Sequence, residues 1–236
     1  MPTTSPDSLV SRGGRSGLAL GMLLMTVPLS ALEIWRLDQL ARVGGHPTTV
    51  IGAPEVVEQD GVAAARFGGF DDALLIHSNP VAGLKAFTIE VLIRPAPDGL
   101  AEQRFVHIQP RGNPVVRVMI ETRVMPDGQW CLDTALFSPT ASRVLIDRTK
   151  LHPPSQWAWV ALRYDGRTMA HFVNGAWEAE GEFDFPPTPP GQTTLGVRHN
   201  LVSWYKGGIR EVRIHPSSLP AERLQRWSAP APSPKT

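Results

Sequence analysis

Residues Trp157–Trp177, WAWVALRYDGRTMAHFVNGAW, decide the fold because they are typical of three antiparallel strands joined by two tight turns. Asp165-Gly166 and Asn174-Gly175 both suit two-residue type I′ turns, since Gly and Asn tolerate the positive φ angles that these turns require. The first turn then places Arg163 opposite Thr168. This stretch predicts a β-meander at the centre of the chain.

Large aromatic side chains recur on one face of this meander. Because successive residues of a strand point to opposite faces, Trp159, Phe172 and Trp177 form a row across the three strands. The second turn also pairs His171 with Glu178, which we expect to be an exposed edge pair, with an acid/base pair as the alternative. We expect the aromatic row to line the space between two stacked sheets.

Composition limits the classes of function. The 236 residues carry 23 basic and 22 acidic side chains, for a net charge of +1, so no global field attracts nucleic acid. The single Cys131 excludes an internal disulfide and a cysteine-rich zinc site. No phosphate-binding loop, dinucleotide fingerprint or HExxH motif is present, so no cofactor is predicted.

The amino-terminal segment is typical of a secretory signal peptide. Residues 1–17 are polar and basic, Leu18–Leu29 is an apolar run too short to span a bilayer, and Ser30-Ala31 offers a cleavage site after Ala31. A buried helix or an uncleaved anchor is the alternative interpretation. We therefore expect export to the periplasm or the exterior, with no stable membrane span after cleavage.

The remaining chain alternates short strands with turns. Ala53–Val57 and Val62–Phe67 form a predicted pair, Phe87–Pro95 alternates most clearly, and Ser218–Trp227 is typical of a short terminal helix. Roughly a dozen strands predict an all-β fold, a two-sheet antiparallel jelly-roll sandwich with a short C-terminal helix. It would occupy residues 32–228, followed by a disordered Pro-rich tail over 229–236.

A long hairpin is predicted around Met125–Gly128, where Pro126 and Gly128 favour a type I turn with a Gly bulge. Its register places Glu121 opposite Asp133. Seven apolar residues share the core face: Val116, Val118, Ile120, Val124, Trp130, Leu132 and Leu136. Four charged residues share the opposite face: Arg117, Glu121, Arg123 and Asp133.

Four segments in order, Ala65–Asp72 (ARFGGFDD), FTIEVLIRP, WAWVALRYDG with FVNG, and GGIREVRI, resemble the laminin-G-like jelly roll of the concanavalin A-like lectin/glucanase superfamily. The resemblance covers about residues 32–228 and implies two stacked antiparallel sheets. The superfamily contains lectins, hydrolases, lyases and spacers, so the resemblance does not decide function.

The resemblance also bears on metal binding and catalysis. Many relatives carry Asp where this chain has Arg210, which disfavours a structural Ca²⁺ there, although Asp71 and Asp72 are candidate oxygen ligands. The two glutamates flanking an aspartate that mark laminarinase-type enzymes are missing from this sequence.

Two sets of residues are candidates for ligand binding. The first set is Arg117, Glu121, Arg123 and Asp133, and the second is His199, Asn200 and Trp204 on one connection. Glu121 and Asp133 are the candidate catalytic pair, but we expect the neighbouring arginines to keep both acids ionised, whereas a general acid needs a raised pKa. A solvated ion-pair ladder is the alternative for the first set, and a core cap is the alternative for Trp204.

The sequence therefore favours an exported, non-catalytic jelly-roll module that binds carbohydrate or another cell-surface partner such as an extracellular protein. The alternative is a glycoside hydrolase or polysaccharide lyase acting through Glu121 and Asp133, with Arg117 or Arg123 neutralising a substrate carboxylate. A structural domain without a ligand is the third reading.

Overall fold

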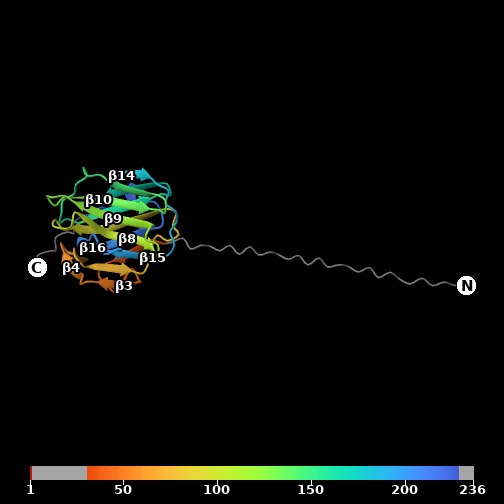
Figure 1. The fold of residues 1–236 in the computed structure, drawn as a ribbon, viewed down its shortest axis with the longest axis horizontal. Coiled ribbons are helices and arrows are strands. Elements are labelled where there is room, and N and C mark those ends of the chain that lie inside the picture. Colours follow the sequence, from red (N-terminus) through yellow and green to blue (C-terminus); the bar gives the residue numbers. More distant parts are fainter. Residues whose placement is uncertain (2–30, 229–236) are drawn as a thin grey trace.

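The computed structural model describes Met1 and residues 31–228 (Figure 1). The predicted signal peptide and the Pro-rich tail lie almost wholly outside the described residues. The first sheet contains β1 (Glu33–Arg36), β4 (Glu55–Gln59), β5 (Val62–Gly68), β7 (Phe87–Pro95), β12 (Ala158–Tyr164), β13 (Thr168–Val173), β14 (Ala176–Glu182) and β16 (Lys206–His215). The second contains β2 (Arg42–Val43), β3 (His46–Ile51), β6 (Ala73–Ile76), β8 (Glu102–Pro110), β9 (Arg117–Val124), β10 (Trp130–Phe137), β11 (Ser142–Ile146) and β15 (Gly191–Leu195).

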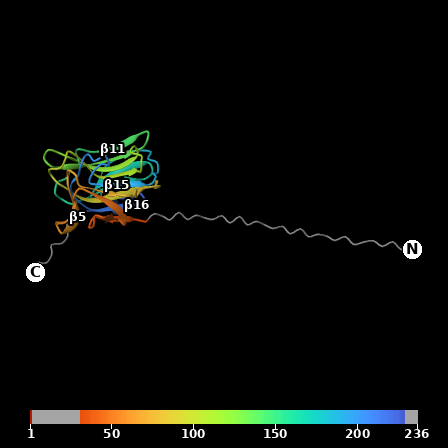
Figure 2. The same ribbon diagram turned by 60° about the horizontal axis from the view of Figure 1, so that its bottom comes forward.

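The strand order is β14-β13-β12-β7-β16-β5-β4 in the first sheet, with β1 also paired to β16, and β11-β10-β9-β8-β15-β6-β3-β2 in the second. All of the pairings between these strands are antiparallel, and Figure 2 shows the two layers from a second direction. No helix within residues 31–228 is long and apolar enough to cross a membrane. The predicted jelly-roll sandwich is confirmed.

The main core lies between the two sheets. Val160, Leu162 and Tyr164 of β12 point into it, as do Ile120 of β9 and Leu132 of β10. The predicted Met125–Gly128 hairpin is confirmed, with Glu121 opposite Asp133, and its seven apolar residues pack in or against this core. The predicted pairing of residues 53–57 with 62–67 is confirmed as β4 and β5.

The aromatic row does not line this core, so that prediction is wrong. Trp159 and Phe172 are buried on the outer face of the first sheet, in two small clusters separate from the main core. Residues of the C-terminal segment, Leu219 and Leu224, cover Phe172, while the Trp177 side chain is 53% exposed. Strand alternation correctly put these rings on one face, but it did not say which face meets the other sheet.

The first turn of the meander differs from the prediction by two residues. Arg163 pairs with Ala170 rather than Thr168, because the Asp165 carboxylate accepts hydrogen bonds from the backbone N–H groups of Arg167 (2.8 Å) and Thr168 (2.6 Å). Asp165 therefore begins the turn, and Gly166 is its first central residue, with a φ of 102°. A two-residue shift leaves every side chain on its predicted face.

The second turn forms at Asn174-Gly175 as predicted, with φ angles of 48° and 73°. A bulge between His171 and Phe172 then pairs His171 with Ala179 instead of Glu178. His171 is fully buried, and its Nδ1 lies 2.9 Å from Thr134 Oγ1 of the second sheet. His171 Nε2 still lies 4.0 Å from Glu178 Oε2, but both side chains are buried, so the prediction of an exposed edge pair is wrong in its exposure.

The C-terminal segment is extended rather than helical, apart from a single 3₁₀ turn at Ala221–Arg223, so the predicted helix over Ser218–Trp227 is wrong. Glu90 holds this segment against the first sheet. Its carboxylate accepts a hydrogen bond from the Gln225 backbone N–H at 2.6 Å, and it lies 2.9 Å from His215 Nε2. These contacts give the segment fixed partners without a helix.

Candidate functional site

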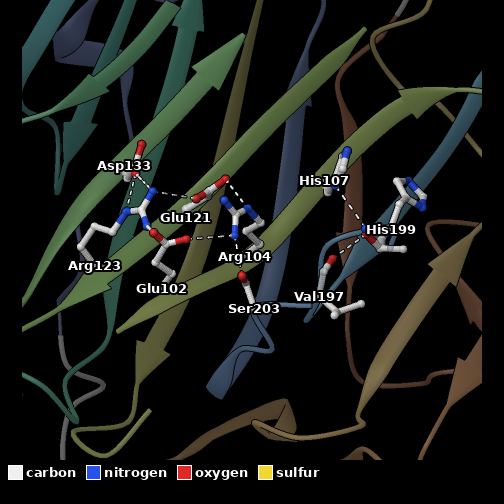
Figure 3. Close-up of polar contacts among 10 residues, drawn as sticks. Glu102, Arg104, His107, Glu121, Arg123, Asp133, Val197, His199 and Ser203 are labelled. Atoms are coloured by element: carbon white, nitrogen blue, oxygen red, sulfur yellow. Dashed lines mark hydrogen bonds and ion pairs between the residues drawn. The ribbon is translucent and has the colours of Figure 1, made fainter. Parts of the chain in front are cut away.

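The charged face of the β9–β10 hairpin forms the floor of the candidate site. Alternation along the two strands puts Glu121, Arg123 and Asp133 on the face of the second sheet that points away from the core. Strand β8 pairs with β9 and adds Glu102 and Arg104 to the same group. A bulge between Arg104 and Val106 places Arg104 opposite Glu121. We call these five residues the ion-pair cluster (Figure 3).

Arg123 and Arg104 connect the acids of the ion-pair cluster. Arg123 contacts Asp133 Oδ2 through both Nε and Nη2 at 2.6 Å, and its Nη2 lies 3.5 Å from Glu121 Oε2. Arg104 Nε lies 2.7 Å from Glu121 Oε1, and Glu102 contacts both arginines. Glu121 and Asp133 are each 1% exposed, so the alternative of a solvated ladder is excluded.

Burial raises the pKa of both inner acids. It raises the pKa of Glu121 to about 7, because the loss of hydration outweighs the attraction of Arg104 and Arg123. Burial likewise raises the pKa of Asp133, against the attraction of Arg123. The expectation that the arginines would hold both acids well ionised is therefore corrected for Glu121.

Two cavities open beside the ion-pair cluster. The first, which we call the Arg123 cavity, has a volume of about 540 Å³ and includes Glu102, Arg123, Met125 and Arg148 in its lining. The second, the Arg117 cavity, measures about 280 Å³. Its lining consists of His107 and Gln109 of β8, Pro114, Arg117 of β9, and Arg198, His199 and Asn200 of the loop after β15.

Histidines from two distant segments meet in the Arg117 cavity. The backbone N–H of His199 donates to His107 Nδ1 at 3.2 Å, and the two ring centroids lie 4.6 Å apart (Figure 3). Burial lowers the pKa of His107 to about 2 and that of His199 to about 4. Both imidazoles are therefore neutral at pH 7. The Arg117 guanidinium lies 4.0 Å from the centroid of the Phe137 ring and donates to the Pro114 carbonyl at 3.1 Å.

The loop that supplies His199 is held in an unusual conformation. Leu201 and Ser203 have φ angles of 58° and 59°, in the left-handed region that L-residues rarely adopt. Arg104 fixes this loop, because its backbone N–H donates to the Ser203 carbonyl at 2.9 Å and its Nη1 donates to Ser203 Oγ at 2.5 Å. The ion-pair cluster therefore supports the wall of the Arg117 cavity.

A family model of the concanavalin A-like lectin/glucanases superfamily matches residues 67–225. The chain belongs to this superfamily. No curated protein sequence matches the chain.

Solved structures of similar fold share little sequence with this superfamily member. Domain 4 of an extracellular arabinanase from Geobacillus stearothermophilus, solved with arabinotriose, has a TM-score of 0.61 and 19% identity, over 81% of this chain and 95% of that one. The binding domain of Paraclostridial Mosquitocidal Protein 1 has a TM-score of 0.63 and 12% identity, over 81% and 50%. The binding domain of Botulinum Neurotoxin DC, in complex with SialylT, has a TM-score of 0.58 and 11% identity, over 81% and 49%. This member thus spans about half of each toxin domain, and the likeness concerns the fold.

The structure divides the predicted ligand-binding residues between two places. Glu121, Arg123 and Asp133 lie together in the ion-pair cluster. Arg117 instead joins the other predicted set, since His199 and Asn200 line the same cavity. Trp204 is half-buried and lies outside the lining of both cavities.

The candidate calcium ligands lie away from this face, and Asp72 has a structural use. Its two carboxylate oxygens accept hydrogen bonds from the backbone N–H groups of Ala53 (2.8 Å) and Gly68 (2.7 Å). Arg210 donates to the Ala63 carbonyl at 2.6 Å. Over residues 31–228, no group of three or more His, Cys, Asp or Glu side chains is arranged to hold a metal ion.

Four contributors were missed from the sequence: Glu102, Arg104, His107 and Arg198. The first three lie on β8, where strict alternation would put His107 on the face opposite Glu102 and Arg104, and the bulge after Arg104 removes that difference. Arg198 directly precedes His199 and could have been noticed as a neighbouring cation.

Proposed function

We propose that this chain is a non-catalytic module that binds carbohydrate on the outer face of β8, β9 and β10. One observation carries the proposal: two cavities flank a buried ion-pair cluster on a single sheet face. Their linings combine guanidinium, imidazole and amide groups with the apolar surfaces of Met125 and Pro126. Such linings suit a sugar, which presents hydroxyl groups and apolar ring faces together.

The fold relatives are consistent with this proposal. The arabinanase domain was solved with arabinotriose, and the other two neighbours are named as binding domains. Membership of the superfamily permits binding without requiring catalysis. An extracellular protein with a polar surface is the other partner that this face would suit.

The bonding of the acids favours binding over catalysis. Both carboxylates of the central pair are engaged by arginines, and a carboxylate held by Arg123 through two contacts is poorly placed to attack a sugar carbon. One observation favours the enzymatic alternative. The pKa of Glu121 is raised to about 7, which suits a general acid. A glycoside hydrolase or lyase would use Glu121 and Asp133, with Arg117 or Arg123 neutralising a substrate carboxylate.

Titration calorimetry of the full chain against neutral and acidic oligosaccharides tests the binding proposal. We expect heat of binding from at least one class, weakened about 10-fold in Arg148→Gln, which changes an exposed residue of the Arg123 cavity. Arg66→Gln is the matched control, because Arg66 is exposed and paired with Glu55 in the other sheet. Silence across both classes would exclude carbohydrate as the partner.

The catalytic alternative has a separate test. Reducing ends or unsaturated products released from a polysaccharide panel, and lost in Glu121→Gln, would establish hydrolysis or elimination. Binding without product release would establish the non-catalytic module.

We further propose that residues 1–31 direct export and are removed, which places the module outside the cytoplasm. Mass spectrometry of the protein recovered from the producing cell should find Leu32 as the first residue. A retained Met1 would contradict cleavage, and recovery in the cytoplasmic fraction would contradict export.

A further inference from the structure

The Arg117 cavity differs from the Arg123 cavity in having no acidic side chain to balance its arginines. The Arg123 cavity contains Glu102 beside its arginines, whereas the Arg117 cavity has no acidic residue in its lining. Neither Arg117 nor Arg198 forms an ion pair with any residue in the described part of the chain. Two partly buried guanidinium groups therefore share a small space without a counter-charge.

The guanidinium of Arg117 packs on the Phe137 ring and lacks a full set of hydrogen-bond partners. Its Nη1 donates to the Pro114 carbonyl, but its Nε is buried without a hydrogen-bond partner. Glu121, an acid nearby, is already engaged by Arg104 and Arg123. Burial, together with the repulsion of Arg198 and Arg104, lowers the pKa of Arg117. A buried donor left unpaired is costly, so a ligand that supplies acceptors would be favoured here.

His107 adds a third donor. Its Nδ1 accepts the backbone N–H of His199, so the neutral ring must carry its proton on Nε2. That Nε2 is buried and without a partner, on a side chain that is 1% exposed. The imidazole is thus fixed as a hydrogen-bond donor by a contact between segments 92 residues apart.

From these donors we infer that the Arg117 cavity is a subsite for the carboxylate of an acidic sugar, held by Arg117 and Arg198 with His107 Nε2 as a further donor. A carboxylate offers two acceptor oxygens in the geometry that guanidinium groups recognise. The volume of about 280 Å³ accommodates one sugar unit rather than an extended chain. The Arg123 cavity would then receive a neighbouring part of the oligosaccharide. This inference rests on the proposed function and deepens it.

Calorimetry with matched acidic and neutral ligands tests the inference on the full chain. Trigalacturonate and a hyaluronan tetrasaccharide are compared with their methyl esters, which keep the sugar and remove the charge. We expect each acid that binds to do so about 10- to 100-fold more tightly than its ester, the ratio that a charged hydrogen bond ordinarily supports. Arg198→Gln and Arg117→Gln should each reduce acid binding to the level of the ester, while Arg66→Gln leaves it unchanged. Arg198 lies in a loop, so its variant remains informative if Arg117→Gln fails to fold.

The outcomes separate this inference from the proposed function. Equal binding of acid and ester would overturn the carboxylate subsite and leave the carbohydrate module standing. Acid selectivity that survives both arginine variants would place the carboxylate elsewhere and overturn the assignment. Inorganic phosphate or acetate that competes at the concentration of the sugar would show a simple anion site, and would also overturn it. Absence of binding by every acid and ester would remove both the inference and the proposed function.

Discussion

Replacing Arg104 by glutamine should destabilise the protein by about 2–4 kcal/mol at pH 8. The Arg104 side chain has two close partners, Glu121 Oε1 at 2.7 Å and Ser203 Oγ at 2.5 Å, and a longer contact of 3.4 Å with Glu102 Oε2. The side chains of Arg104 and Glu121 are only 11% and 2% exposed, so water cannot replace the lost contacts. Removing one partner of a buried ion pair costs about 3–5 kcal/mol, and the glutamine that replaces Arg104 recovers part of this because it can still donate a hydrogen bond.

The destabilisation caused by Arg104→Gln should increase with pH, because Glu121 titrates in this range. Burial raises the pKa of Glu121 from 4.5 to about 7, so the folded protein binds the proton more tightly than the unfolded chain. The contribution of this group to stability is therefore full below pH 4.5 and is lost as the pH rises toward 7, by about 3 kcal/mol in all. Arg104 is the largest influence lowering that pKa. Without Arg104, the pKa rises above 7 and the loss continues toward pH 8.

The measurement is urea unfolding of the wild type and Arg104→Gln at intervals from pH 5 to pH 8. The difference in the free energy of unfolding should widen by about 1 kcal/mol or more between pH 6 and pH 8. It should remain constant when Glu121→Gln is present in both proteins, because the titrating group is then gone. Hydrogen exchange in residues 198–204 should accelerate in the variant, since Ser203 loses a contact.

A difference that is flat across this pH range would refute the reasoning, because it would show that Glu121 does not titrate there. A variant as stable as the wild type at pH 8 would refute the stronger claim that the ion pair supports the fold.

Three further predictions concern the rest of the molecule. Phe172→Ala should lower the free energy of unfolding by about 3–5 kcal/mol although Phe172 lies outside the main core, whereas Trp177→Ala should change it by less than about 0.5 kcal/mol, measured by urea unfolding. Glu90→Gln should weaken the contact with the Gln225 backbone and make the chain end cleavable by protease at lower urea; unchanged protection would contradict this anchor. Burial lowers the pKa of three histidines: His107 to about 2, and His171 and His199 to about 4. Because the unfolded chain binds these protons first, the free energy of unfolding should fall below pH 6.5 by about 1.4 kcal/mol per pH unit for each histidine. The titration of Glu121 partly offsets this loss. A free energy of unfolding that rises toward pH 5 would contradict the prediction.

Local chemistry settled the features that the sequence predicted correctly. Pro126 and Gly128 specify the turn between β9 and β10, so the pairing of Glu121 with Asp133 followed from a few neighbouring residues. Asn174-Gly175 specified the second turn of the meander in the same way. Strand alternation assigned side chains to faces, and it remained correct even where the first turn shifted by two residues.

β-Bulges are one feature that could not be predicted from the sequence and was found only in the structure. An extra residue near Phe172 moved the partner of His171 to Ala179, and another beside Arg104 turned that side chain toward Glu121. A bulge is stabilised by contacts on the neighbouring strand, so the alternation of a single strand does not reveal it.

What the sequence by itself determined is the jelly-roll class, the tight turns and the set of polar side chains on the β9–β10 hairpin. Only the tertiary structure decided which face of each sheet is covered, and by what: Phe172 is covered by Leu219 and Leu224, and Arg117 meets His199. These partners lie some 50 or 80 residues away along the chain. Burial depends on such distant segments, and burial in turn sets the pKa of Glu121 and the unpaired state of His107 Nε2.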